Sequence, residues 1–210
     1  MGSLQRIRCY CFLSSTGFWV ANFVAFNADV CRVLADDFMA LAEKQGAPVP
    51  LMIGHHLLAT TLLFTGDLAE ARAHYQRAVT FYNPVQHRPL AVRFGQDVRV
   101  AILSYRSRAL WLLGYPEAAQ RDNDVAVKEA REIAHATSLM YALAFTSLTN
   151  VPCGNFANAS KDIDELAALA DEKNAAFWKA VALLARGQLL ILTIVLDSLS
   201  ESQETQGFDG

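Results

Sequence analysis

The chain has 210 residues, of which 53% are apolar, and its 18 basic and 21 acidic side chains give a formal net charge of −3. A chain of this size and apolar content can bury a sizeable core without disulfide or metal cross-links. Its basic residues are scattered rather than clustered, so the sequence shows no positive surface that would attract a phosphate backbone. We therefore expect no nucleic-acid partner.

Residues 1–16 form an N-terminal segment that allows two interpretations. Arg6 and Arg8 precede an uncharged run from residue 9 to residue 28, as they would in a signal peptide or a membrane segment. The continuous apolar stretches of this run are shorter than the roughly twenty residues that span a bilayer. The alternative is a first helix that buries four aromatic residues, Phe18, Trp19, Phe23 and Phe26. We expect a cytoplasmic protein, with N-terminal targeting as the minor alternative and membrane association disfavoured.

The cysteines and histidines do not follow the pattern of a cross-link or a metal site. Four cysteines suit small buried thiols in a reducing compartment better than disulfides: Cys9, Cys11, Cys31 and Cys153. No second Cys or His pair follows the first two cysteines at the spacing of a structural zinc site. The adjacent His55 and His56 would point about 100° apart on a helix, so we give them and His74 a structural or solvent-facing role. We expect no metal and no cofactor.

Residues 27–48 are expected to contain the second helix of a first, degenerate helix pair. Asn27 or Asp29 can cap the start of this helix, and Gly46 with Pro48 can end it. Apolar residues recur along it in steps of three and four, which predicts that they form its buried face: Val30, Val33, Leu34, Phe38 and Leu41.

Residues 57–82 have the pattern of a complete pair of antiparallel helices. The first helix places apolar residues on one face, and so does the second: Leu58, Ala59, Leu62 and Leu63, then Leu68, Ala71, Tyr75 and Ala78. Between them the sequence Thr65-Gly66-Asp67 breaks the pattern, and its glycine allows the chain to leave the first helix in a tight turn.

The spacing of this helix pair resembles that of a tetratricopeptide repeat (TPR). The resemblance is carried by Gly66, Leu68, Ala71, Tyr75 and Ala78, with the small Ala59 seven residues before the glycine. Small residues at Ala59 and Ala71 would let the two helices approach closely. The resemblance implies an all-α fold, an α/α superhelix of TPR-like antiparallel helix pairs over residues 17–188.

Residues 83–97 depart from the repeat and are expected to form an ordered insertion. Pro89 is incompatible with a regular helix through the middle, and the alternation of Leu90, Val92 and Phe94 predicts an extended segment. Because loops that depart from a repeat often carry the binding site, five polar residues are our candidate binding surface: His87, Arg88, Arg93, Gln96 and Asp97. The alternative is that Arg88, Arg93 and Asp97 only cap and pin the flanking helices.

Two further units follow the insertion. Their turn glycines are Gly114 and Gly154, and small residues recur after them at Ala119, Ala126 and Ala159. A last first-helix pattern is expected to bury five residues: Phe177, Trp178, Val181, Leu184 and Ala185. Residues 189–210 are interpreted as a divergent helix end with a polar, disordered tail. Both ends of the array lack a polar capping helix, which predicts self-association through the exposed apolar residues Phe18, Trp19, Phe23, Leu189, Leu190, Ile194 and Val195.

A wider resemblance concerns the segments HRPLAVRFGQD and LSYRSRALWLLGYPEAA. They are similar to the C-terminal helical repeats of bacterial multidomain proteins that join a class III adenylate or guanylate cyclase domain to an AAA-type ATPase. The chain contains no phosphate-binding loop of the G-x-x-x-x-G-K-[ST] type. The resemblance implies a non-catalytic interaction or regulatory module that binds a protein or peptide partner. Adjacent domains of a larger protein are among the partners that it implies.

The competing hypothesis is a small-molecule or nucleotide-related enzyme, or an effector-sensing domain, that uses residues 83–97. His87 with Asp97 or Glu117 could serve as an acid–base pair. No nucleophile, oxyanion donor or metal pattern completes such a site, so we expect no catalytic residues.

Overall fold

The computed structural model describes residues 14–206, and this part of the chain is helical throughout, with no strand. A helix over residues 14–24 comes first. The later elements are α2 (Ala28–Gln45), α3 (Pro48–Thr65), α4 (Leu68–Thr80), α5 (Pro84–His87), η1 (Arg88–Leu90), α6 (Ala91–Phe94), α7 (Val98–Leu112), α8 (Pro116–Ile133), α9 (Ala136–Asn150), α10 (Phe156–Glu172) and α11 (Ala176–Gln206). The predicted all-α fold is confirmed.

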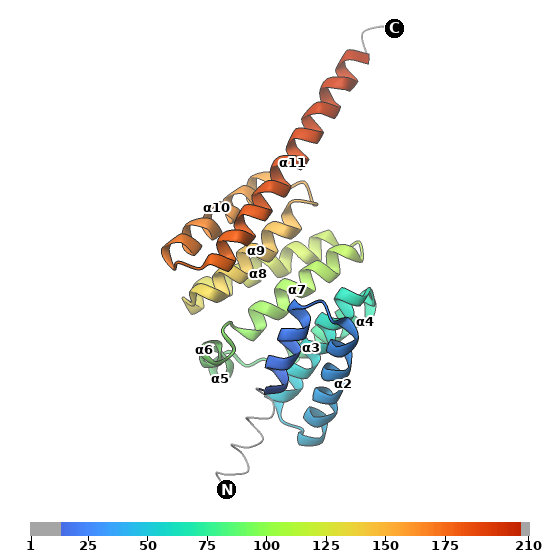
Figure 1. Ribbon diagram of the computed structural model, residues 1–210, viewed down its shortest axis with the longest axis vertical. Coiled ribbons are helices and arrows are strands. Elements are labelled where there is room, and N and C mark those ends of the chain that lie inside the picture. The colour runs from blue at the N-terminus through green and yellow to red at the C-terminus, as the bar shows by residue number, and fades with distance from the viewer. Residues whose placement is uncertain (1–13, 207–210) are drawn as a thin grey trace.

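The long helices form antiparallel pairs that stack into a TPR-like superhelix (Figure 1). We call the helix over residues 14–24, α3, α7, α9 and α11 the first helices, and α2, α4, α8 and α10 the second helices. Within the described residues, α3 packs against α4, α7 against α8 and α9 against α10. Successive first helices also contact one another, α3 with α7, α7 with α9 and α9 with α11. The first helices therefore line one common face of the stack.

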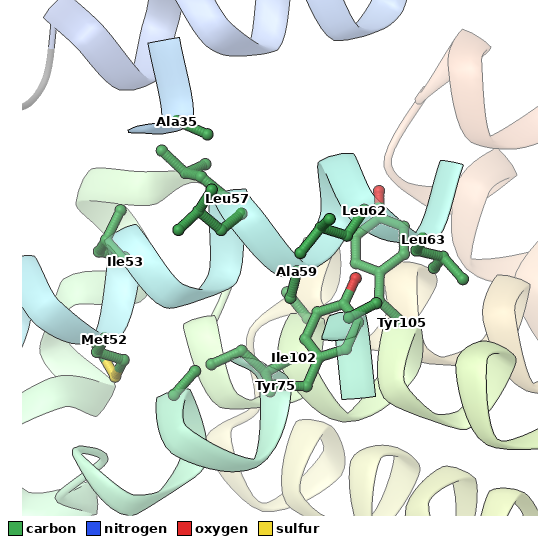
Figure 2. Close-up of a cluster of buried hydrophobic side chains, with 14 of the residues drawn as sticks. Ala35, Met52, Ile53, Leu57, Ala59, Leu62, Leu63, Tyr75, Ile102 and Tyr105 are labelled. Carbon is green, nitrogen blue, oxygen red and sulfur yellow. The ribbon is translucent and has the colours of Figure 1, made fainter. Parts of the chain in front are cut away.

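The α3–α4 pair shows why this sequence forms such a unit. Ala59 of α3 and Ala71 of α4 are fully buried, and small side chains at these positions allow the helix axes to come close. Tyr75 of α4 is also fully buried, and its hydroxyl donates a hydrogen bond to Thr60 Oγ1 at 3.0 Å. Figure 2 shows this tyrosine among the apolar side chains of α3 and α7. The pair is thus a close-packed unit in which the buried hydroxyl of Tyr75 is satisfied.

The same arrangement recurs in the later units. Ala119 and Ala126 of α8 and Ala159 of α10 are fully buried, like Ala78 of α4. The turn glycines all adopt left-handed backbone conformations, with φ of 97° at Gly66, 83° at Gly114 and 75° at Gly154. A residue with a Cβ atom adopts this conformation only with strain, so these positions favour glycine.

Two glycine substitutions test this account of the turns. Gly66→Ala is expected to lower the free energy of unfolding by about 1 kcal/mol, because alanine is strained at a positive φ. Gly17→Ala is the matched control, since Gly17 lies within the helix over residues 14–24 and its added Cβ would also meet open space. It is expected to raise stability by about 0.5–1 kcal/mol. Urea denaturation measures both, and equal effects of the same sign would contradict the assignment.

The expected aromatic face of the first helix is only partly right. Trp19 is buried and its indole N–H donates to Thr61 Oγ1 of α3 at 3.0 Å. Phe18 and Phe26, however, are 65% and 90% exposed. Phe26 lies in the turn after the helix at a φ of 58°, so it cannot share the helix's buried face. Because Trp19 is buried, it is not available for self-association either.

The buried face of α2 is also displaced from the expected one. Phe38 is buried, but Val30, Val33 and Leu41 are 45%, 59% and 51% exposed. The face that meets α3 instead uses smaller residues, Cys31, Ala35 and Ala42. The two helices pack so closely that a Cβ at Gly54 of α3 would lie 2.8 Å from Met39 Sδ. The close approach of the two helices requires small side chains at the contact. A prediction based on large apolar residues therefore identified the wrong face of α2.

The insertion is ordered but not extended, so the expectation for Leu90, Val92 and Phe94 is wrong. These residues belong to η1 and α6, two of three successive short helical turns. Pro89 does interrupt any single long helix, yet it lies at the start of η1, where its missing N–H leaves no helical hydrogen bond unmade. Helical turns rather than a strand therefore connect α4 to α7.

The C-terminal region differs from the expectation as well. α11 continues as a helix through Gln206, so the polar tail predicted from residue 200 is helical as far as the structure describes it, and residues 207–210 lie outside the described part. Ala182 and Ala185 are buried, whereas Phe177 and Leu184 are 69% and 70% exposed. The C-terminal half of α11 projects beyond the rest of the stack (Figure 1).

Two helices of the described chain are long and apolar enough to cross a membrane by length and composition. Pro48–Thr65 is 61% buried inside the protein, as expected of a core helix. Ala176–Leu196 has a mean hydropathy of 1.8 and is only 11% buried. The segment Ala176–Leu196 of α11 thus leaves an unusually large apolar surface exposed.

Candidate interaction groove

The first helices surround a cavity of ≈ 540 Å³, which we call the aromatic groove. Its walls come from the helix over residues 14–24, α3, α7, α9 and α11, and from residues 94–96 of the insertion. None of the second helices contributes to it. Eight aromatic side chains line it: Trp19, Phe23, Phe94, Tyr105, Tyr141, Phe145, Phe177 and Trp178. The groove is therefore the concave side of the stack.

The aromatic rings hold one another in place. Trp19 stacks on Phe23 with ring centroids 4.9 Å apart, and Tyr141 stacks on Phe145 at 4.8 Å. The edge of Tyr105 meets Phe145 at 4.6 Å. Such contacts add to the stability from buried area and limit ring motion. The groove thus presents a preformed apolar surface.

Few polar groups face the groove, and His56 of α3 is the most unusual of them. Its ring lies beside both Tyr75 and Tyr105, with centroids 6.2 and 5.9 Å away. Its Nδ1 is buried and has no hydrogen-bond partner among the described residues. Burial lowers the pKa of His56 from 6.5 to about 4. His56 is therefore neutral at pH 7 and adds no charge to the groove.

Arg108 of α7 places a positive charge near the groove. Leu148 of α9 lines both the groove and a second cavity of ≈ 340 Å³, which also contains Arg108 and Trp111. The Arg108 guanidinium donates to the Leu148 carbonyl oxygen at 3.1 Å and lies 5.3 Å from the centre of the Trp111 ring. Burial lowers the pKa of Arg108. An acidic group on a bound partner would find a partly desolvated cation here.

The structure places the candidate residues of the insertion at different sites. His87 is buried, its Nδ1 accepts the Asn83 backbone N–H at 3.0 Å, and burial lowers its pKa. Asp97 is fully buried and caps α7, because its Oδ1 accepts the backbone N–H groups of Arg99 and Val100 at 2.9 and 3.1 Å. Both side chains therefore hold the insertion in place. For Asp97, this is the capping role that the alternative to a binding surface expects.

The other candidates of the insertion are more exposed. Arg88 forms an ion pair of 3.1 Å with Glu132 of α8, with both side chains partly in solvent. Gln96 lines the aromatic groove and hydrogen-bonds with the Tyr141 hydroxyl. The side chain of Arg93 lies outside the described residues. Binding through Arg88 and Gln96 stays a prediction, and only Gln96 of the two belongs to the groove.

The acid–base pair of the enzyme hypothesis is engaged elsewhere. Asp97 also accepts the Tyr82 hydroxyl at its Oδ2, at 2.8 Å, so both of its oxygens serve the fold. His87 Nδ1 is occupied by Asn83. Glu117 lies in the exposed first turn of α8. Within residues 14–206, no three His, Cys, Asp or Glu side chains are arranged to hold a metal ion.

One polar contact was not foreseen from the sequence. His55 of α3 and His74 of α4 meet with their Nδ1 atoms 2.9 Å apart, and His55 is only 6% exposed. Burial, together with the neighbouring His74 and Arg77, lowers the pKa of His55 from 6.5 to about 4. One imidazole must donate and the other accept, so the contact requires that the accepting ring be neutral and is lost when both rings are protonated.

Comparison with known proteins agrees with the central repeat. Residues 52–77, which span most of α3 and α4, match the family model of the tetratricopeptide repeat. No curated protein matches the chain. The match and the stacked helix pairs show a TPR-like region, a type of repeat that generally mediates protein–protein interaction.

Proposed function

We propose that the chain is a non-catalytic interaction module that holds an apolar segment of a partner protein in the aromatic groove. The observation that carries the proposal is the ≈ 540 Å³ cavity lined by the first helices and by residues 94–96 of the insertion. Its rings are fixed by mutual contacts, so binding would order few side chains. The match of residues 52–77 to a tetratricopeptide repeat supports the same class of function.

The chemistry of the groove favours a helical segment over an extended one. An extended peptide leaves its backbone N–H and C=O groups to be satisfied by the receptor. The groove offers few such partners, since apolar and aromatic side chains dominate its walls. An amphipathic helix satisfies its own backbone and needs only an apolar stripe at positions i, i+3, i+4 and i+7. Arg108 would favour an acidic residue at one end of that stripe.

The partner is a separate protein or an adjacent domain of a larger one. A location beside a cyclase or ATPase domain rests on the sequence resemblance alone. The groove itself requires only an apolar helix, whichever polypeptide supplies it.

Selection of peptides displayed on phage tests the groove. We expect wild-type protein to enrich sequences with apolar residues at helical spacing, often beside an acidic residue. Val20→Asp with Val24→Asp should weaken binding of the enriched peptides at least about tenfold, because these two side chains line the groove and are exposed. Val85→Asp with Val92→Asp is the matched control on exposed valines outside it. Failure to enrich, or equal weakening by both pairs, would refute the proposal.

A further inference from the structure

The projecting half of α11 carries a continuous apolar surface that nothing in the described chain covers. We define the α11 surface by four side chains, each between 47% and 64% exposed, that lie on one side of the helix: Leu190, Ile191, Ile194 and Val195. Leu183 and Leu184, at 68% and 70%, extend it toward the stack. Together these six side chains expose on the order of 700 Å² of mostly apolar surface, close to what one partner contributes to a standard interface.

The described residues leave this surface open. The helix over residues 14–24 lies at the opposite end of the stack from the projecting half of α11 (Figure 1).

A bilayer does not fit α11. Its N-terminal half is fixed to α10, because Ala182 and Ala185 are buried and Lys179 and Arg186 pair with Asp171 and Asp164. Insertion would break these contacts and move two cations into hydrocarbon. The free apolar part, residues 190–199, is about 15 Å long as a helix, half of the roughly 30 Å that a span needs.

We propose that the α11 surface pairs with the α11 surface of a second copy of this chain. The surface is self-complementary, since residues 187–196 contain no charge that would repel a copy. The two cations of α11 are neutralised by α10 of their own chain. Two identical apolar faces related by a twofold axis form the commonest kind of oligomer.

Gly187 gives an independent reason to expect another helix here. Glycine inside a helix costs about 1 kcal/mol relative to alanine. Gly54 of α3 allows close packing, because an added Cβ would lie 2.8 Å from Met39 Sδ of α2. Gly187 has no such neighbour among the described residues, as an added Cβ meets no atom of them within 4 Å. A helix from the second copy would occupy this open space and explain the glycine.

Sedimentation of the full chain tests the pairing. We expect a dimer at about 50 µM, a concentration that populates complexes with a Kd in the low micromolar range. Leu190→Lys with Ile194→Lys should raise the Kd at least about tenfold, because it places like charges in the contact. The control, Val85→Lys with Val92→Lys, changes equally exposed valines elsewhere and should leave the dimer intact. Circular dichroism shows that each variant is folded.

A second variant tests the pairing without the Leu190→Lys/Ile194→Lys substitutions. Gly187→Leu should increase helix stability in the monomer yet raise the dimer Kd at least about tenfold, by filling the space that the other helix needs. A wild-type monomer at about 50 µM overturns the proposal, and so does a Gly187→Leu dimer of unchanged Kd. Flotation of the wild-type chain with phosphatidylcholine–phosphatidylglycerol vesicles, lost in Leu190→Lys/Ile194→Lys, would assign the surface to a membrane instead.

Discussion

Lowering the pH from about 7 to about 4.5 is expected to remove several kcal/mol of unfolding free energy, because the buried imidazoles take up protons far more readily in the unfolded chain. His55 and His56 have pKa values lowered from 6.5 to about 4, chiefly by burial. Burial also lowers the pKa values of His74 and His87. Stability is therefore complete above pH 6.5 and is lost as the pH falls toward about 4.

The expected size of this loss follows from the shifts. Depressions like those of His55 and His56 correspond to on the order of 3 kcal/mol for each residue at the acid end. Asp162 acts in the opposite direction, since burial raises its pKa from 3.8 to about 6 and favours the folded state in acid. The histidines dominate, because more of them are shifted.

Urea denaturation at pH 7 and at about pH 4.5, in wild type and His56→Phe, measures this effect. The ring of His56 lies beside two tyrosine rings and its buried Nδ1 has no partner among the described residues, so phenylalanine should be tolerated at pH 7. The variant should lose on the order of 3 kcal/mol less than wild type on acidification. Equal losses in the two proteins would show that His56 is not buried in its neutral form.

The second large effect concerns Asp97, whose hydrogen bonds connect the end of the insertion to α7 and to Tyr82. Asp97→Ala is expected to lower the free energy of unfolding by about 3 kcal/mol, since it removes the cap of α7 and leaves the Tyr82 hydroxyl without its acceptor. Burial, the largest cause of the raised pKa of Tyr82, remains in this variant, so the phenol stays protonated with an unpaired O–H donor. The shift in the urea midpoint gives the value.

Asp97→Asn is the control, because its amide oxygen can still accept the N–H groups of Arg99 and Val100 and its NH₂ group can donate to Tyr82. We expect a loss of about 1 kcal/mol for this variant and of less than 1 kcal/mol for Arg88→Ala, whose ion pair is exposed. A loss of unfolding free energy for Asp97→Ala no larger than that for Arg88→Ala would disprove a stabilising role for the buried hydrogen bonds of Asp97.

The central helix pair could be predicted because its determinants are local. Gly66 ends α3 at a positive φ, and the small Ala59 and Ala71 lie on facing helix surfaces at fixed distances from it in the sequence. Such rules depend on a few neighbouring residues and on helix periodicity. The all-α class and the antiparallel pairs followed from the same rules.

The groove and the correct helix faces depend on contacts between distant segments. Trp19 and Trp178 line one cavity, yet no local pattern relates them. Val33 is exposed and Ala35 is buried because α3 approaches α2 closely, which the periodicity of α2 does not encode. The polar side chains of the insertion suggested a binding surface, whereas one of them, Asp97, caps a helix. Tertiary packing decided each of these cases.

Photo-crosslinking to a phage-selected peptide tests the groove most directly. Benzoylphenylalanine placed at Val24 lies on the wall of the aromatic groove, whereas at Val125 it lies on α8, one of the second helices. Both valines are exposed, so either site tolerates the probe. The account predicts that the peptide is captured at position 24 and not at position 125. Capture at position 125 with none at position 24 would contradict it.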